Sequence, residues 1–362
     1  MVLLHGGPGG NDYLGSIMPE LEGFDVVRYG QRSVPPAPVE GPYTVERHLA
    51  DLVAVLGALR LDHVWLLGHS WGGHLALHAL AAMPERFAAA VIVDPLGPLP
   101  EQPGAFERML KRDLDQQQLA RLDEIDALEQ AGNSTDEAAL ESVKIVWPNY
   151  HHDRAQPPPM PPMRFSVEGY TGAMESVAAH FEAGTLAEKL PGVTVPTVFV
   201  HGASSPLDVE HSRAGRRLMP AAELVIVDHA GHFPWLEQPG CVRQAVERLR
   251  LRVPLASLPL EQRGQTRSSA CRPGPVVSFR TMIQRLVITG GGERGRRAVR
   301  SLPRPFCKPG MFAEAGVDGP RPGRPVRIPL GAMRWRTGGD GQLTWTTEVG
   351  TAAAAYFEIS VD

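Results

Sequence analysis

The stretch HVWLLGHSWGGHLALHAL, residues 63–80, decides the fold, because it joins a short apolar run to a helical pattern through a glycine-rich turn. Val64–Leu67 predicts a buried strand, and a helix is predicted from about Trp71 to Met83. Ser70 stands between them, with a glycine two residues to either side. A nucleophilic serine on a strained strand-to-helix turn requires such glycines, because the turn leaves no room for Cβ atoms. The stretch therefore predicts a nucleophile elbow that carries Ser70.

Short β-type runs and helical patterns alternate through the first 252 residues of the chain. Further strands are predicted at Val2–Leu4, Phe24–Arg28, Ala88–Val93, Thr197–Val200 and Leu224–Val227, and further helices at Val45–Leu59, capped by Thr44, and at Gln238–Leu251. Strands that alternate with helices are typical of a parallel sheet whose two faces are both covered. The sequence therefore predicts an α/β fold with a mostly parallel sheet and helices on both faces.

The same patterns divide the chain into three parts. Residues 1–95 and 196–252 form the α/β core, and residues 96–195 contain polar, helix-forming stretches without a strand, which predicts a helical cap over the active edge of the sheet. Residues 253–362 are rich in Pro and Gly, and this composition predicts an irregular, largely disordered tail. Within that tail only QLTWTTEV and AYFEISVD have strand character, and they predict one isolated hairpin.

Composition excludes several classes of function. The net charge is −4, and the basic excess in the tail forms no nucleic-acid motif, so no nucleic-acid partner is expected. The three cysteines contain no CxxC pair, which argues against a disulfide framework or a zinc site. The start of the chain lacks a signal-peptide pattern and no apolar run approaches a membrane span, so a cytoplasmic location without membrane contact is expected. The pattern GGGERG, residues 290–295, lacks the βαβ context of a dinucleotide site, and no cofactor is predicted.

Two further motifs complete the expected chemistry. The loop HGGPGG, residues 5–10, follows the first strand, and a backbone N–H in it can point at a developing oxyanion. A second donor would be the N–H of Trp71, the residue after the nucleophile. His232, in the segment GHFPW, follows the last predicted strand of the core, which is the place where a hydrolase with this order of elements carries its base.

Residues 1 to about 252 resemble the α/β-hydrolase fold, and within it the proline iminopeptidase-type branch. The motifs that carry the resemblance are HGGPGG, RYGQRS, GHSWGG and GHFPWLEQP. The resemblance implies a nucleophile at Ser70, a base at His232, oxyanion N–H groups at Gly7 and Trp71, and a helical cap.

The sequence departs from that branch at three places. The chain begins inside the strand that precedes HGGPGG, so the first two strands of the fold are missing, which predicts a truncated start and an exposed edge at Phe24–Arg28. Gly30 stands where an aspartate is usual. The cap glutamates that hold a substrate's free amine have only Glu168 and Glu175 as candidate substitutes, and both fit ordinary solvated helix positions better.

The acid of the triad is displaced. Its usual position after the strand Thr197–Val200 holds Ser205, which cannot supply a charge. Asp94, at the end of the strand AVIVD, and Asp208, three residues beyond Ser205, are the two candidates. Asp94 is preferred, because Asp208 also fits the start of a helix near Val209.

Together these features predict a serine hydrolase of the α/β-hydrolase fold that cleaves small esters or amides through an acyl-enzyme. Its partner would be a small-molecule or short-peptide substrate, and a proline iminopeptidase-like activity is included in this prediction. The alternative is a non-catalytic or impaired binding protein on the same fold, which the missing strands and the displaced acid make plausible.

Overall fold

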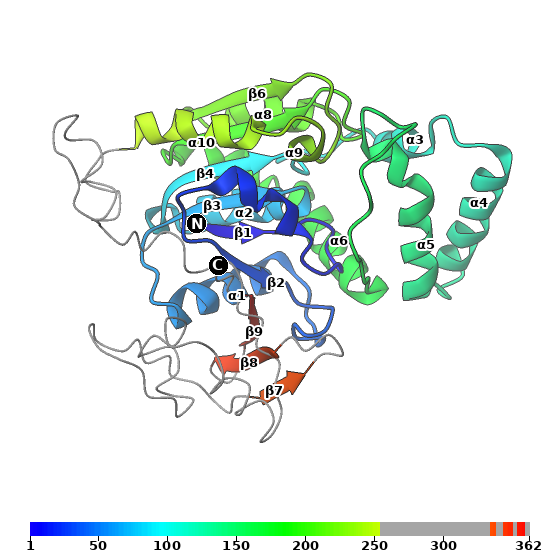
Figure 1. The fold of residues 1–362 in the computed structure, drawn as a ribbon, viewed down its shortest axis with the longest axis horizontal. Coiled ribbons are helices and arrows are strands. Elements are labelled where there is room, and N and C mark those ends of the chain that lie inside the picture. The colour runs from blue at the N-terminus through cyan, green and yellow to red at the C-terminus, as the bar shows by residue number, and fades with distance from the viewer. Residues whose placement is uncertain (254–333, 338–342, 350–352, 359–362) are drawn as a thin grey trace, which may run out of the picture.

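The computed structural model describes residues 1–253, 334–337, 343–349 and 353–358. Six parallel strands form the centre of the sheet, and they lie in the order β6-β5-β4-β3-β1-β2. Their bounds are β1 Val2–Leu4, β2 Val27–Gly30, β3 Val64–His69, β4 Phe87–Val93, β5 Thr197–Gly202 and β6 Ala222–Val227. The predicted parallel α/β fold is therefore confirmed (Figure 1).

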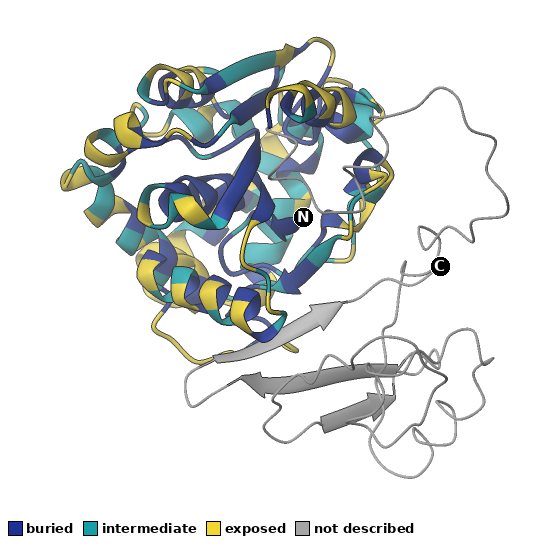
Figure 2. Ribbon diagram, turned by 90° about the vertical axis from the view of Figure 1, so that its left-hand side faces the viewer, coloured by how far each residue is buried: buried dark blue, intermediate teal, exposed yellow. Residues whose placement is uncertain are grey.

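Alternate residues of the central strands enter two different hydrophobic cores. Leu66 of β3 packs with α1 (Val45–Ala58) and α2 (Trp71–Ala82), whereas its neighbour Leu67 packs with η1 (Leu14–Leu21) and α10 (Cys241–Arg252). Side chains alternate across a strand, so a sheet covered on both faces needs apolar residues at nearly every position. Figure 2 shows the result: the central strands are buried, and exposed residues lie along the outer sides of the helices.

The segment between β4 and β5 is helical wherever an element is assigned. It contains α3 (Ala105–Lys111), α4 (Gln116–Gln130), α5 (Asp136–Val146), η3 (Trp147–Tyr150), α6 (Val167–Glu182), α7 (Thr185–Lys189) and η4 (Leu190–Gly192). Good caps explain the longer helices: Asp115 and Gln118 form a capping box on α4, and Thr135 caps α5. The pair α4 and α5 projects beside the sheet, whereas α6 lies against the core (Figure 1).

Near the C-terminus the chain forms β7 (Arg334–Thr337), β8 (Leu343–Val349) and β9 (Ala353–Glu358). The predicted pairing of two strands in the tail is confirmed, because β8 pairs antiparallel with β9. The expectations that this hairpin is isolated and that the second core strand has an exposed edge are wrong. The strand β9 pairs antiparallel with β2, with Arg28 opposite Glu358 and Gly30 opposite Tyr356. Backbone hydrogen bonding therefore continues past β2, where an open edge was expected.

Smaller elements complete the core: η2 (Pro84–Arg86), α8 (Glu210–Leu218) and α9 (Pro234–Glu237). The predicted cap of α1 is confirmed, because the Thr44 side chain accepts a hydrogen bond from the Arg47 N–H. The predicted disorder of most of the tail and the glycine pattern at residues 290–295 lie outside the described residues.

Candidate active site

Ser70 occupies a strained turn between β3 and α2. Its φ of 58° and ψ of −123° are unusual for a residue with a side chain. A Cβ atom on Gly68 would lie 2.2 Å from the carbonyl oxygen of Gly72, and a Cβ atom on Gly72 would lie 2.1 Å from that of Leu4. The glycines around the serine are therefore required by backbone contacts, as the elbow pattern predicted.

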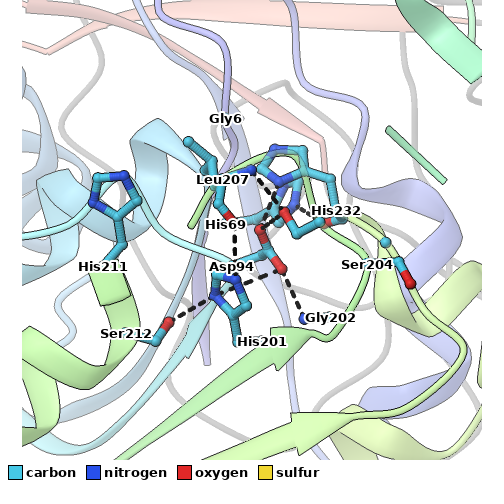
Figure 3. A network of polar contacts seen from close by, with 12 residues as sticks. Gly6, His69, Asp94, His201, Gly202, Ser204, Leu207, His211, Ser212 and His232 are labelled. Atoms are coloured by element: carbon cyan, nitrogen blue, oxygen red, sulfur yellow. Dashed lines mark hydrogen bonds and ion pairs between the residues drawn. The ribbon is translucent and has the colours of Figure 1, made fainter. Parts of the chain in front are cut away.

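His232 follows β6 in a short loop, and each of three groups of this residue has its own hydrogen-bond partner. Its Nδ1 lies 2.8 Å from Oδ1 of Asp94 (Figure 3). Its backbone N–H donates to the carbonyl oxygen of Tyr150 in the cap, and its carbonyl oxygen lies 2.8 Å from Nε2 of His69. The side chain is only 4% exposed. These contacts fix the imidazole while leaving Nε2 as the ring nitrogen directed away from Asp94.

Asp94 lies at the carboxyl end of β4, beside the strand that carries Ser70. Its side chain is fully buried, and its φ of 41° shows a second strained backbone at this edge of the sheet. Oδ2 accepts a hydrogen bond from the Gly202 N–H at 2.8 Å, and Oδ1 accepts one from the Ser205 hydroxyl at 2.6 Å as well as the His232 contact. A buried carboxylate with three donors is well satisfied.

Histidines near Asp94 keep it ionised. Burial alone would raise the pKa of Asp94, but His201, His232 and the Ser205 hydrogen bond together hold that pKa below its ordinary value. His201 lies 3.8 Å from Oδ2 of Asp94 and contacts the Ser212 hydroxyl and the Leu207 carbonyl. The carboxyl group can therefore remain charged beside the imidazole of His232.

The structure separates the two candidate acids. Asp94 contacts His232 directly, whereas Asp208 is exposed and its Oδ1 accepts a hydrogen bond from the Glu210 N–H at the start of α8. Asp208 therefore contacts the start of the helix near Val209, as the sequence also predicted for it.

The loop HGGPGG lies against the nucleophile. A Cβ atom on Gly6 would lie 2.6 Å from Cβ of Ser70, so this loop approaches the serine as closely as backbone allows. Gly7 has a φ of 60°, and its carbonyl oxygen accepts a hydrogen bond from Gly10 in a tight turn. Trp71 is the first residue of α2, and its indole Nε1–H donates to Gln31 at 2.8 Å.

Several residues at this edge were not singled out from the sequence. Gln31 donates its side-chain amide to the His5 carbonyl and accepts from Trp71, so it joins the oxyanion loop to the elbow. Its position in RYGQRS was the available signal. Tyr13 and His69 also join segments around Ser70, and their hydrogen bonds cross too much sequence for a local pattern to predict.

Glu237, in the segment GHFPWLEQP, holds the base loop against the cap. Its Oε2 accepts from the Gly231 N–H at 2.7 Å, and its Oε1 accepts from the N–H groups of His152 and Asp153. The ring of Tyr150 lies against that of His232, with 5.3 Å between centroids and 37° between the ring planes. Cap residues thus form part of the wall beside the candidate base.

Glu168 and Glu175 are both exposed on α6, in agreement with ordinary solvated helix positions. In the part of the chain that the structure describes, no cluster of three or more His, Cys, Asp or Glu side chains could hold a metal ion. Among the same described residues, no helix is both long enough and apolar enough to cross a membrane.

Comparison with known proteins identifies the fold of the chain. The model of a protein family described as alpha/beta hydrolase fold matches residues 1–239. A proline iminopeptidase of Heyndrickxia coagulans is 22% identical over 253 residues, which cover 66% of this chain and 86% of that protein. One from Lactobacillus helveticus is 26% identical over 66% of this chain and 85% of its own length. The crystal structure of VinJ superposes with a TM-score of 0.51 at 21% identity, covering 69% of this chain and 89% of VinJ, which shows a shared fold.

Proposed function

The chain belongs to the alpha/beta hydrolase fold family, and on that premise we propose that it is a serine hydrolase with Ser70 as nucleophile, His232 as base and Asp94 as acid. The observation that supports this most directly is the 2.8 Å contact between His232 Nδ1 and Asp94 Oδ1 beside the strained serine. A carboxylate can only accept this hydrogen bond, so the proton lies on Nδ1 and Nε2 is free to take the serine proton.

The proposed reaction is acyl transfer. Ser70 attacks a substrate carbonyl while His232 Nε2 accepts the hydroxyl proton, and Asp94 stabilises the imidazolium that forms. The backbone N–H groups of Gly7 and Trp71 would stabilise the charge on the carbonyl oxygen. His232 then donates its proton to the leaving group, and water releases the acyl group from Ser70 by the same steps in reverse.

Small esters are the preferred substrate class. The wall beside His232 is aromatic, because Tyr150 and Phe233 both lie within 5.3 Å of its ring between centroids. The two cap glutamates considered for binding a substrate amine are solvent-exposed. An aminopeptidase activity on N-terminal proline is the second candidate, since the two full-length relatives above carry the name proline iminopeptidase.

Two measurements test the proposal. A fluorophosphonate probe should label the wild-type protein rapidly and the Ser70→Ala variant not at all. Hydrolysis of a series of p-nitrophenyl esters, compared with prolyl anilides, then separates the two substrate classes. A folded wild-type protein that neither reacts with the probe nor cleaves any of these substrates would favour the non-catalytic binding protein.

A further inference from the structure

Tyr13 lies between the oxyanion loop and the nucleophile elbow. Its hydroxyl oxygen is 3.0 Å from the Gly6 N–H and 2.6 Å from Nδ1 of His69, the residue before Ser70. A Cβ atom on Gly6 would lie 2.2 Å from this hydroxyl, so the two groups meet at the closest approach that the backbone permits. The side chain is 9% exposed.

His69 continues the contact to the base. It is fully buried, and its Nε2 lies 2.8 Å from the carbonyl oxygen of His232 (Figure 3). Its ring also packs against Phe233 and edge-on against Trp235, at 5.0 and 4.8 Å between centroids. The ring is therefore held in one orientation by packing and by hydrogen bonds on both nitrogens.

The groups at the two ends of this row of hydrogen bonds, the Gly6 N–H and the His232 carbonyl, determine where each proton lies. The His232 carbonyl can only accept, so His69 Nε2 carries a proton and His69 Nδ1 is an acceptor. The Gly6 N–H can only donate, so the Tyr13 oxygen accepts from it and the phenolic proton goes to His69 Nδ1. Each of the three donors in this row of hydrogen bonds therefore has an acceptor.

Both Tyr13 and His69 are expected to remain uncharged. Burial raises the pKa of Tyr13 well above its ordinary value. Burial, together with the nearby His232, lowers the pKa of His69 well below its ordinary value. A cation at His69 would oppose the imidazolium that the proposed mechanism forms on His232, whereas a neutral relay holds the base without opposing its charge.

We propose that Tyr13 and His69 are positioning residues: a hydrogen-bonded relay that fixes the oxyanion loop at Gly6–Gly7 and the backbone of His232 in register about Ser70. This inference rests on the proposed hydrolase function and extends it. The relay touches no substrate, and it acts through the backbone groups at its two ends. Because these ends serve the oxyanion donor and the base, its loss should reduce the rate of acyl transfer more than substrate binding.

Tyr13→Phe is the direct test, because it keeps the ring and leaves the Gly6 N–H and His69 Nδ1 without a partner. We expect kcat for a p-nitrophenyl ester to fall by about 10- to 100-fold with KM changed by less than about threefold. The rate of fluorophosphonate labelling should fall in parallel. Tyr29→Phe is the matched control, since the Tyr29 hydroxyl is also buried but has no hydrogen-bond partner among the residues that the structure describes, and it should leave kcat unchanged.

A second pair of variants tests the other half of the relay. A glutamine at position 69 can still donate to the His232 carbonyl, whereas a leucine cannot. We therefore expect His69→Gln to retain clearly more activity than His69→Leu, and this pair decides the question if Tyr13→Phe does not fold. A merely structural role would lower the melting temperature of both variants without this difference in kcat.

The possible outcomes distinguish a failure of the relay hypothesis from a failure of the proposed hydrolase function. Folded Tyr13→Phe with wild-type kcat, a loss confined to KM, or equal activity of the two His69 variants would overturn the relay and leave the hydrolase intact. A wild-type protein that the probe does not label would overturn the proposed function and the relay with it.

Discussion

Replacing Asp94 by asparagine should leave the fold intact and stop the reaction, for a reason visible in its hydrogen bonds. An asparagine has one acceptor oxygen and one donor amide, whereas the carboxylate accepts on both oxygens. The Gly202 N–H on Oδ2 can only donate, so the asparagine oxygen must face it. The amide then faces His232 Nδ1 and the Ser205 hydroxyl.

That orientation gives His232 the wrong tautomer. The Ser205 hydroxyl, which already accepts from the Leu207 N–H, must then rotate to accept one amide proton and gives up its own acceptor on residue 94. An unpaired buried donor costs about 1–3 kcal/mol, which is less than the stability of a typical domain. The other amide proton needs an acceptor at His232 Nδ1, which moves the ring proton to Nε2, the atom that must accept the serine proton. In serine proteases the equivalent change lowers kcat about 10⁴-fold. At about 1.36 kcal/mol for each factor of ten, this is about 5.4 kcal/mol of transition-state stabilisation.

The assay is steady-state and burst-phase hydrolysis of a p-nitrophenyl ester, with the melting temperature of each variant measured beside it. Asp208→Asn is the control: its side chain is exposed and accepts a hydrogen bond from the Glu210 N–H at the start of α8, so turnover should be unchanged. Folded Asp94→Asn with kcat within about tenfold of wild type, or an equal loss in Asp208→Asn, would refute the assignment of the acid.

Three further changes test the surrounding structure. Gly72→Ala should lower the free energy of unfolding by about 3 kcal/mol or more, because its Cβ would meet a backbone carbonyl of β1. Gly57→Ala, in open space on α1, should raise it by about 0.5–1 kcal/mol. Equal melting temperatures of the two variants would contradict this reasoning. Burial lowers the pKa of His48 to about 3 and that of His74 to about 4, so the unfolded chain binds more protons below pH 6.5. Each histidine should then lower stability by about 1.4 kcal/mol per pH unit as the pH falls from about 6.5, which thermal unfolding between pH 8 and 5 would detect and a flat profile would exclude. A chain ending at residue 253 loses β9 from the edge of β2 and should self-associate in size-exclusion chromatography, and a monomeric truncated protein would argue against that role for β9.

Local patterns predicted the fold well, because β3, β4 and β5 are apolar at nearly every position and Thr44 marks the start of α1. Errors occur where an apolar residue packs without belonging to a strand. Phe24 was assigned to a strand, but its N–H closes the turn after η1 and its ring packs on Trp65 at 5.1 Å between centroids, so β2 begins only at Val27. The last core helix begins at Cys241, later than predicted, because Gly240 adopts a left-handed φ of 95°.

In the candidate site too, some residues could be predicted from local sequence and others could not. Ser70 and the loop that contains His232 were predicted from short contiguous motifs. Tyr13 contacts His69, His69 contacts His232, and Glu237 contacts His152, and each pair is far apart in sequence, so a single chain gives no local signal for it. The helical character of residues 96–195 could be predicted from composition, but not the backbone contact of Tyr150 with His232.

The serine at the usual position of the acid has its own explanation in this geometry. Ser205 donates its hydroxyl to the carboxylate of Asp94, and Gly202, at the end of the same strand β5, donates its N–H to the other oxygen. The loop after β5 therefore donates hydrogen bonds to the proposed acid, Asp94 of β4, which in turn contacts His232. A second carboxylate at position 205 would face Asp94 at hydrogen-bond distance, and two such groups could not both stay ionised. With Asp94 on β4 as the proposed acid, a small neutral donor at position 205 is compatible with the charge on that carboxylate.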